Sequence, residues 1–259
     1  MNALRSFVMA FSTFSRIPMP KIDWRPECMR YMMCFFPLIG IVLGLLVWVW
    51  GIVCDWLSLG SLLFGAGLVA IPLLVTGGIH LDGFSDVVDA QSSHAEPARK
   101  REILKDPHTG AFAGMAVSAY LIVYFACAAS LEPTPRLFAC LGCIYVLTRC
   151  LSGIASICFA GSSDEGMVAS FRLSASKRVC VIVQTIEALT CAAVTAVLGD
   201  GVVLAAMMVI ALLVLALVHG FARRQFGGWS GDIAGFFLQV CELALLLCLV
   251  VVPKVVNLI

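Results

Sequence analysis

The sequence predicts an all-α protein, a polytopic integral membrane bundle of about seven transmembrane helices with its N-terminus in the cytoplasm. Three observations predict this fold class. Hydrophobic residues make up 61% of the 259 residues and charged residues 13%, against about 45–50% and 25% in globular domains. Apolar stretches long enough to cross a bilayer recur along the chain. Positive charges gather in alternate connections between these stretches. We therefore expect one membrane domain over residues 1–259.

Seven apolar stretches are long enough to form transmembrane helices, since about 20 helical residues cross a hydrocarbon core of about 30 Å. They cover residues 34–54, 57–79, 110–131, 137–160, 178–198, 201–221 and 232–252. Three of the connections between them are short turns. The other three are long and polar, and they are residues 80–109, 161–177 and 222–231.

The lysines and arginines predict the orientation, because cytoplasmic connections of membrane proteins carry an excess of these residues. The chain has 17 of them. All fall in the N-terminal segment or in and beside the three long connections, except Arg136, Arg149 and Lys254. We therefore expect the N-terminus and the long connections to be cytoplasmic loops, with the C-terminus outside.

Residues 1–33 predict an amphipathic segment that lies at the membrane interface. The apolar stretch Leu4–Phe14 is too short to cross a bilayer, and Pro18 and Pro20 prevent a helix from continuing beyond it. Such a segment buries its apolar face at the cytoplasmic surface and keeps basic side chains such as Arg16 near the headgroups.

A histidine and three aspartates follow the second apolar stretch, in the order His80, Asp82, Asp86 and Asp89. On a helix that continues from that stretch, with about 100° between successive residues, the three carboxylates share one face. No lysine or arginine lies between residues 77 and 98, so the carboxylates repel one another unless a cation binds them. All-oxygen ligands favour magnesium, manganese or calcium. The simpler alternative is a solvated acidic helix end.

Two further aspartates are expected at the same membrane face. Asp106 lies just before the third apolar stretch, and Asp232 opens the seventh. Each is placed to join the carboxylates of the second stretch as a metal ligand. Asp232 follows glycines and a serine, so a helix N-cap is the alternative for it.

Basic residues near these aspartates predict a site for phosphate or diphosphate. Lys105, Arg223 and Arg224 lie in the same connections, and cationic side chains beside a bound metal ion suit phosphate groups. Arg149 lies inside the fourth stretch, where a charge costs about 2.5–3.5 kcal/mol. It therefore either pairs with Glu187 or Glu242, or lines a polar cavity that admits a substrate.

Five motifs follow one another along the chain: Phe11-Ser-Thr-Phe-Ser-Arg16-Ile-Pro-Met-Pro20, Phe36-Pro-Leu-Ile-Gly40, Gly77-Gly-Ile-His80-Leu-Asp82-Gly-Phe-Ser-Asp86-Val-Val-Asp89, Leu104-Lys105-Asp106-Pro-His-Thr-Gly110-Ala-Phe-Ala-Gly114 and Gly231-Asp232-Ile-Ala-Gly235. In this order they resemble the motifs of the cobalamin synthase family of adenosylcobinamide-GDP ribazoletransferases. The chain departs from the family pattern at Ala90, where glycine is usual, and at Ser230, where threonine is commoner.

The resemblance implies a magnesium-dependent membrane enzyme of a late step in vitamin B12 biosynthesis. Such an enzyme transfers adenosylcobinamide phosphate from adenosylcobinamide-GDP to α-ribazole or α-ribazole 5′-phosphate, and releases GMP. It implies catalytic roles for His80, Asp82 and Lys105. The remaining expected site residues are the magnesium ligands Asp82, Asp86, Asp89, Asp106 and Asp232, and the substrate contacts Arg16, Arg149 and Arg223.

The expected location is the cytoplasmic (inner) membrane of a prokaryote, with the active site facing the cytoplasm. The bilayer and the two substrates are the expected partners, and a homo-oligomer is compatible with them. A net charge of +1 leaves no basic excess for nucleic acid. Two other functions stay open: another membrane transferase that uses diphosphates, of the prenyl or CDP-alcohol type, and a divalent-cation transporter. An acidic cluster at a loop–membrane boundary, rather than at the midplane, disfavours the transporter.

Overall fold

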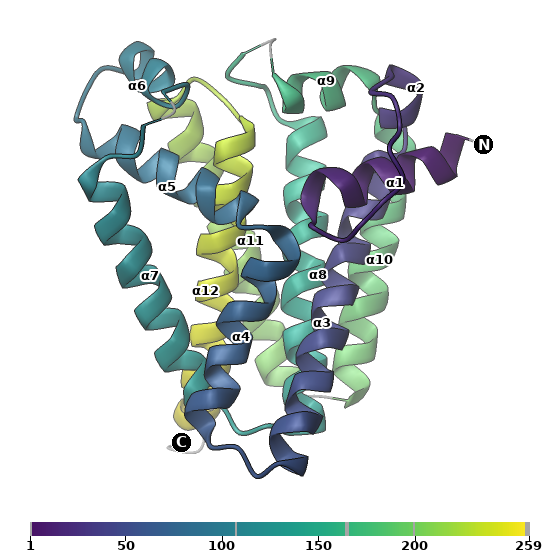
Figure 1. Ribbon diagram of the computed structural model, residues 1–259, viewed down its shortest axis with the longest axis vertical. Helices are drawn as coiled ribbons and strands as arrows, with labels where there is room; N and C mark the ends of the chain where they lie inside the picture. The colour runs from purple at the N-terminus through teal and green to yellow at the C-terminus, as the bar shows by residue number, and fades with distance from the viewer. Residues whose placement is uncertain (1, 107, 164–165, 199, 257–259) are drawn as a thin grey trace.

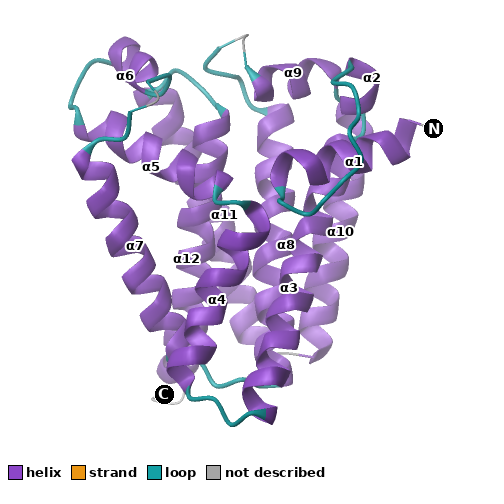
Figure 2. Ribbon diagram, viewed as in Figure 1, coloured by secondary structure: helices purple, strands orange, loops and turns teal. Residues whose placement is uncertain are grey.

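The computed structural model describes residues 2–106, 108–163, 166–198 and 200–256, and within these ranges the chain folds as a helical bundle (Figure 1). The described residues form no strand, and their only β-bridge is an isolated one between Gly161 and Trp229. Figure 2 shows the helices joined by short loops and turns. The predicted all-α fold class is confirmed.

Among the described residues, six helices are long and apolar enough to cross a membrane. Their limits lie within a few residues of six of the seven predicted stretches, because long apolar runs define such helices in the sequence. They are α3 (Met32–Trp56), α7 (Ala111–Ala129), α8 (Pro135–Cys158), α10 (Lys177–Leu198), α11 (Gly201–Gln225) and α12 (Gly231–Val256).

The second predicted stretch does not continue as one straight helix. It forms α4 (Ser61–Thr76) and α5 (Ile79–Ser92), which meet at an angle of 94°, and this pair is a seventh span if the two are counted together. Gly77 and Gly78 separate them, with φ of 66° and 77°. Glycine adopts this left-handed conformation without a Cβ penalty and commonly ends a helix there. The aspartates therefore lie on a separate helix that turns away from α4.

The long connections were expected as cytoplasmic loops, with a helix only where the second stretch continues over the aspartates after His80, but they contain further helices. The connection over residues 80–109 holds α5 and α6 (Pro97–Ile103), and residues 161–177 hold α9 (Met167–Ser174). In Figure 1 these helices lie at the end of the bundle that also carries α1 (Asn2–Phe14) and α2 (Pro26–Met29), whereas the C-terminus lies at the other end. These helices contain many polar residues, so their sequences lack the regular apolar pattern from which a helix is predicted.

Helix α1 packs against the protein along its apolar face. Met9, Ala10 and Phe11 are buried in a cluster with Phe36 and Ile39 of α3. Close packing on α3 therefore fixes the position of the last turn of α1, which borders the cavity described below.

Close contact between α3 and α8 depends on Gly40. A Cβ at this position would lie 2.6 Å from the carbonyl oxygen of Tyr145. Gly40→Ala should therefore push the two helices apart and lower the free energy of unfolding by about 1–3 kcal/mol, measured by thermal unfolding in detergent. Gly142→Ala is the matched control, since a Cβ on Gly142 meets nothing within 4 Å. Equal stability of the two variants would contradict the assigned role of Gly40.

A proline in α3 creates a polar contact between α3 and α10. Pro37 has no backbone N–H, so the carbonyl oxygen of Met33 lacks its usual donor within the helix. The side-chain Nε2 of Gln184, from α10, donates to this oxygen at 2.6 Å. Gln184 is fully buried, and inside a membrane such a bond replaces the missing one.

Arg149 pairs with Glu242 in the core, one of the two partners that the sequence offered for it. The Nη1 of Arg149 on α8 lies 2.9 Å from Oε1 of Glu242 on α12, and it also donates to the carbonyl oxygen of Tyr145 at 2.9 Å. Both side chains are buried. Charges removed from water need such a partner.

Candidate active site

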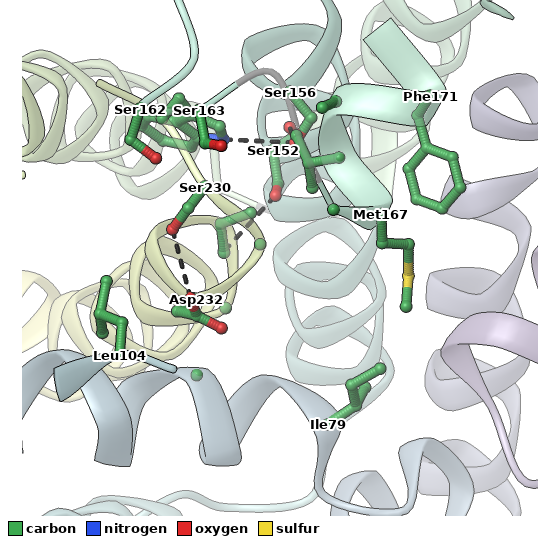
Figure 3. A pocket seen from close by; sticks show the side chains of 18 of the residues that line it. Ile79, Leu104, Ser152, Ser156, Ser162, Ser163, Met167, Phe171, Ser230 and Asp232 are labelled. Atoms are coloured by element: carbon green, nitrogen blue, oxygen red, sulfur yellow. Dashed lines mark hydrogen bonds between the residues drawn. The ribbon is translucent and has the colours of Figure 1, made fainter. Parts of the chain in front are cut away.

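A cavity of about 740 Å³ lies at the end of the bundle that holds the long connections. Its wall combines residues of α1, α3, α5, α6, α8, α9 and α12, and Figure 3 shows part of this lining. The volume is in the range of about 300–1,000 Å³ that is typical of small-molecule sites. Elements from the whole length of the chain therefore contribute to one cavity.

Two glycines bring α5 and α12 into direct contact beneath this cavity. A Cβ on Gly83 would lie 2.9 Å from the carbonyl oxygen of Asp232, and one on Gly235 would lie 2.9 Å from that of His80. Larger residues would separate the two helices. The close crossing is what places Asp82 and Asp232, distant in the sequence, on the wall of the same cavity.

The N-cap of α12 is provided by Ser230. Its Oγ accepts a hydrogen bond from the backbone N–H of Ile233 at 3.2 Å and donates to Oδ2 of Asp232 at 3.4 Å (Figure 3). The capping role considered for Asp232 in the sequence analysis therefore belongs to Ser230. The carboxylate of Asp232 borders the cavity instead.

His80 is buried at the edge of the cavity, with 5% of its surface exposed. Its Nε2 has no hydrogen-bond partner among the described residues. The imidazole lies beside the packed pair of Phe14 and Phe36, with its centroid 6.3 Å from that of Phe14 and 5.8 Å from that of Phe36. The ring is thus held by packing, and one nitrogen remains able to bond a ligand.

Two basic residues border the cavity from α6 and the turn after it. Lys105 was expected there, and Arg101, which the motifs did not mark, lies one helical turn earlier. The Nη1 of Arg101 donates to the carbonyl oxygen of Phe226 at 3.4 Å. Arg101 could have been recognised in the sequence because it lies four residues, about one helical turn, before the other cation, Lys105. Together they supply positive charge to the cavity that Asp82 and Asp232 border.

The other predicted metal ligands differ in their surroundings. Asp86 interacts electrostatically with Asp82, Asp89 and Asp232. Asp89 accepts a hydrogen bond from the backbone N–H of Gly110 at 3.2 Å, so it also holds the start of α7. The structure therefore brings Asp82, Asp86 and Asp232 near one another and gives Asp89 a second role.

Asp106 is exposed and has a local partner. Its Oδ1 accepts a hydrogen bond from the backbone N–H of His108 at 3.0 Å and lies 2.7 Å from the ring Nδ1 of the same residue. These bonds hold the pKa of Asp106 below its usual value. Asp106 borders none of the cavities described, so the structure does not place it with the carboxylates of α5 and α12.

The three arginines expected to bind substrate lie in different places. Arg16 packs over Gly77 and borders a second cavity of about 640 Å³, which Asp82 also borders. Arg149 is held in the core by Glu242. Arg223 is exposed on α11 and borders neither cavity. Only Arg16 is thus placed next to a carboxylate of the α5 motif.

The carboxylates suit a hard divalent cation by their chemistry. No described ion pair involves Asp82, Asp86, Asp89 or Asp232, so their mutual repulsion is not relieved by a basic residue in contact. Oxygen ligands of this kind are those that magnesium prefers. As the side chains lie, however, no three His, Cys, Asp or Glu residues among the described ones surround a single point. The donor set fits magnesium by its chemistry, and the side chains would have to rotate to gather around one ion.

Comparison with known proteins identifies the family. The family model described as cobalamin-5-phosphate synthase matches residues 6–250. The adenosylcobinamide-GDP ribazoletransferase of Lachnoclostridium phytofermentans is 38% identical over 256 residues, which cover 99% of this chain and 97% of that protein. The protein of the same name from Clostridium botulinum (strain Alaska E43) is 30% identical over 244 residues, covering 93% and 95%. No solved structure matches significantly. The match over nearly the whole chain, with the motif residues of α5 and α12 on one cavity, shows that this membrane protein belongs to the cobalamin-5-phosphate synthase family.

Proposed function

We propose that the protein is an adenosylcobinamide-GDP ribazoletransferase. It transfers adenosylcobinamide phosphate from adenosylcobinamide-GDP to α-ribazole or α-ribazole 5′-phosphate and releases GMP. Its family and the names of its relatives support this reaction. The structural observation that carries the proposal is one cavity that brings carboxylates and cations from distant motifs together, namely Asp82 and Asp232 with Arg101 and Lys105.

The cavity contains the groups that the transfer needs. A ribose hydroxyl oxygen bonds to the phosphorus that carries the cobinamide arm, and the bond from that phosphorus to the oxygen of GMP breaks. The hydroxyl proton moves to a base, for which Nε2 of His80 is available because it has no other partner. Lys105 and Arg101 offset the negative charge on the phosphate oxygens as GMP leaves.

Magnesium is proposed as the cofactor, held by Asp82, Asp86 and Asp232. When bound, it would neutralise phosphate oxygens and polarise the phosphorus for attack. Asp89 and Asp106 would support this site from its surroundings. Asp89 accepts a hydrogen bond from the backbone N–H of Gly110, and Asp106 accepts one from that of His108. Arg16, at the second cavity beside Asp82, is placed to contact the phosphates of the substrate.

The proposed location is the cytoplasmic membrane, with the cavity open to the cytoplasm. The end of the bundle that holds the cavity also carries nearly all of the lysines and arginines, which favour the cytoplasmic side. A cavity at one end of the bundle suits a membrane-surface enzyme better than a transporter, whose site lies near the midplane.

The proposal is tested by a product assay. Membranes that contain the protein should form cobalamin, or its 5′-phosphate, and GMP in equal amounts from the two substrates when magnesium is present. Removal of magnesium with EDTA should abolish product formation, and added magnesium should restore it. Membranes prepared without the protein are the control. Uptake of metal ions into vesicles without product would overturn the transferase and support a transporter.

A further inference from the structure

Four aromatic rings from four separate elements meet at one side of the cavity, and we call them the aromatic corner: Phe14 (α1), Phe36 (α3), His80 (α5) and Phe171 (α9). The centroid of Phe14 lies 4.4 Å from that of Phe36 and 6.0 Å from that of Phe171. All four residues border the cavity. Rings arranged in this way form an apolar wall suited to a flat aromatic group.

The start of α12, with Ser230 and Asp232, lies apart from Phe171 in the wall of the cavity. In Figure 3, Phe171 and Met167 of α9 lie on one side, and Ser230 and Asp232 lie on the other. The cavity therefore has an apolar part and a charged part. A ligand that fills both has a flat apolar group joined to a polar group that reaches the carboxylates.

His80 marks the boundary between the two parts. It belongs to the aromatic corner by its ring contacts, and it lies two residues before Asp82 on the same helix. Its Nε2 is buried and has no partner among the described residues, although buried polar atoms are nearly always bonded. A hydroxyl attached to the flat group of a ligand would satisfy this nitrogen.

We propose that the aromatic corner binds the benzimidazole base of α-ribazole and that the ribose extends from it toward His80 and Asp82. This inference rests on the proposed function and adds the placement of its nucleoside substrate. A nucleoside fits a cavity of about 740 Å³, whereas the corrinoid of the other substrate is much larger. Guanine is excluded by chemistry, because its edge carries several donors and acceptors that phenylalanines leave unbonded. A dimethylbenzimidazole carries methyl groups and a single free ring nitrogen, which suit an apolar wall.

The test measures substrate affinities of variants of the full-length protein in detergent or nanodiscs. Phe171→Leu should raise the KM for α-ribazole about three- to tenfold, the scale of one lost aromatic contact. It should leave the KM for adenosylcobinamide-GDP within about twofold. Phe14→Leu, at a less buried position, is a second variant in case Phe171→Leu does not fold. Phe221→Leu is the matched control, since Phe221 packs on Phe226 and Phe236 and borders neither cavity.

Equilibrium dialysis of labelled α-ribazole, without the second substrate, gives a readout that does not depend on turnover. The dissociation constant should rise by the same factor as the KM in Phe171→Leu and stay unchanged in Phe221→Leu. An active enzyme in which both corner variants bind α-ribazole normally would overturn the inference. An increase confined to the KM for adenosylcobinamide-GDP would assign the aromatic corner to that substrate and would also overturn the inference. Absence of product from the unaltered protein would contradict the proposed function instead.

Discussion

Asp82→Asn should lower the rate of cobalamin formation by at least about 10³-fold. Asp82 borders both cavities and interacts with the carboxylates of Asp86 and Asp232. An amide is a weaker metal ligand than a carboxylate and carries no charge. A bound metal ion supplies several kcal/mol of transition-state stabilisation, and each 1.36 kcal/mol is a tenfold change in rate. The measurement is kcat in purified membranes, normalised to the amount of protein.

Asp55→Asn provides the matched control for this loss. Asp55 is an exposed aspartate in the last helical turn of α3, at the other end of the bundle. Its replacement should leave the rate unchanged, and both variants should be recovered from the membrane in normal amounts. Near-normal activity of Asp82→Asn would contradict the proposed roles of this residue in metal binding and catalysis.

Glu242→Ala should destabilise the protein by about 3–5 kcal/mol, the cost of leaving one buried charge without its partner. The guanidinium of Arg149 would keep its bond to the carbonyl oxygen of Tyr145 and lose the carboxylate at 2.9 Å. The double variant Arg149→Met with Glu242→Leu removes both charges and should recover most of the lost stability. Thermal unfolding in detergent measures the difference.

The comparison of single and double variants is what makes this result specific. If the two are equally unstable, the loss comes from the shape of the side chains and not from an unpaired charge. The substrate contact that the sequence analysis expected for Arg149, from its place inside an apolar stretch, makes a different prediction. If Arg149 contacts the substrate, the double variant Arg149→Met with Glu242→Leu should have a higher KM even though its unfolding temperature is restored.

The apolar stretches were predictable because a bilayer requires long runs of apolar residues, whatever the tertiary contacts. The direction of α5 was not predictable in this way. Gly77 and Gly78 were visible as a site where a helix can end, but the angle of 94° depends on the packing of α5 against α12. That packing requires Gly83 and Gly235, which lie about 150 residues apart in the chain.

The charged residues of the candidate site could be predicted from the sequence. Aspartates such as Asp82 and Asp232 are conspicuous in a chain with 13% charged residues. The aromatic corner was not, because nothing in the sequence shows that Phe14 and Phe36, which lie in two of the motifs, meet Phe171, which lies in none. Only the three-dimensional structure shows which of these side chains border the cavity.

The bond between Gln184 and Met33 has a consequence for biosynthesis. The two residues are 151 positions apart, so the ribosome completes most of the chain after Met33 has emerged and before its oxygen meets the amide. Asp232 follows later still. A nascent chain halted after α8 would therefore lack both Gln184 and Asp232, so the contact between α3 and α10 and the α12 wall of the cavity form only late in translation.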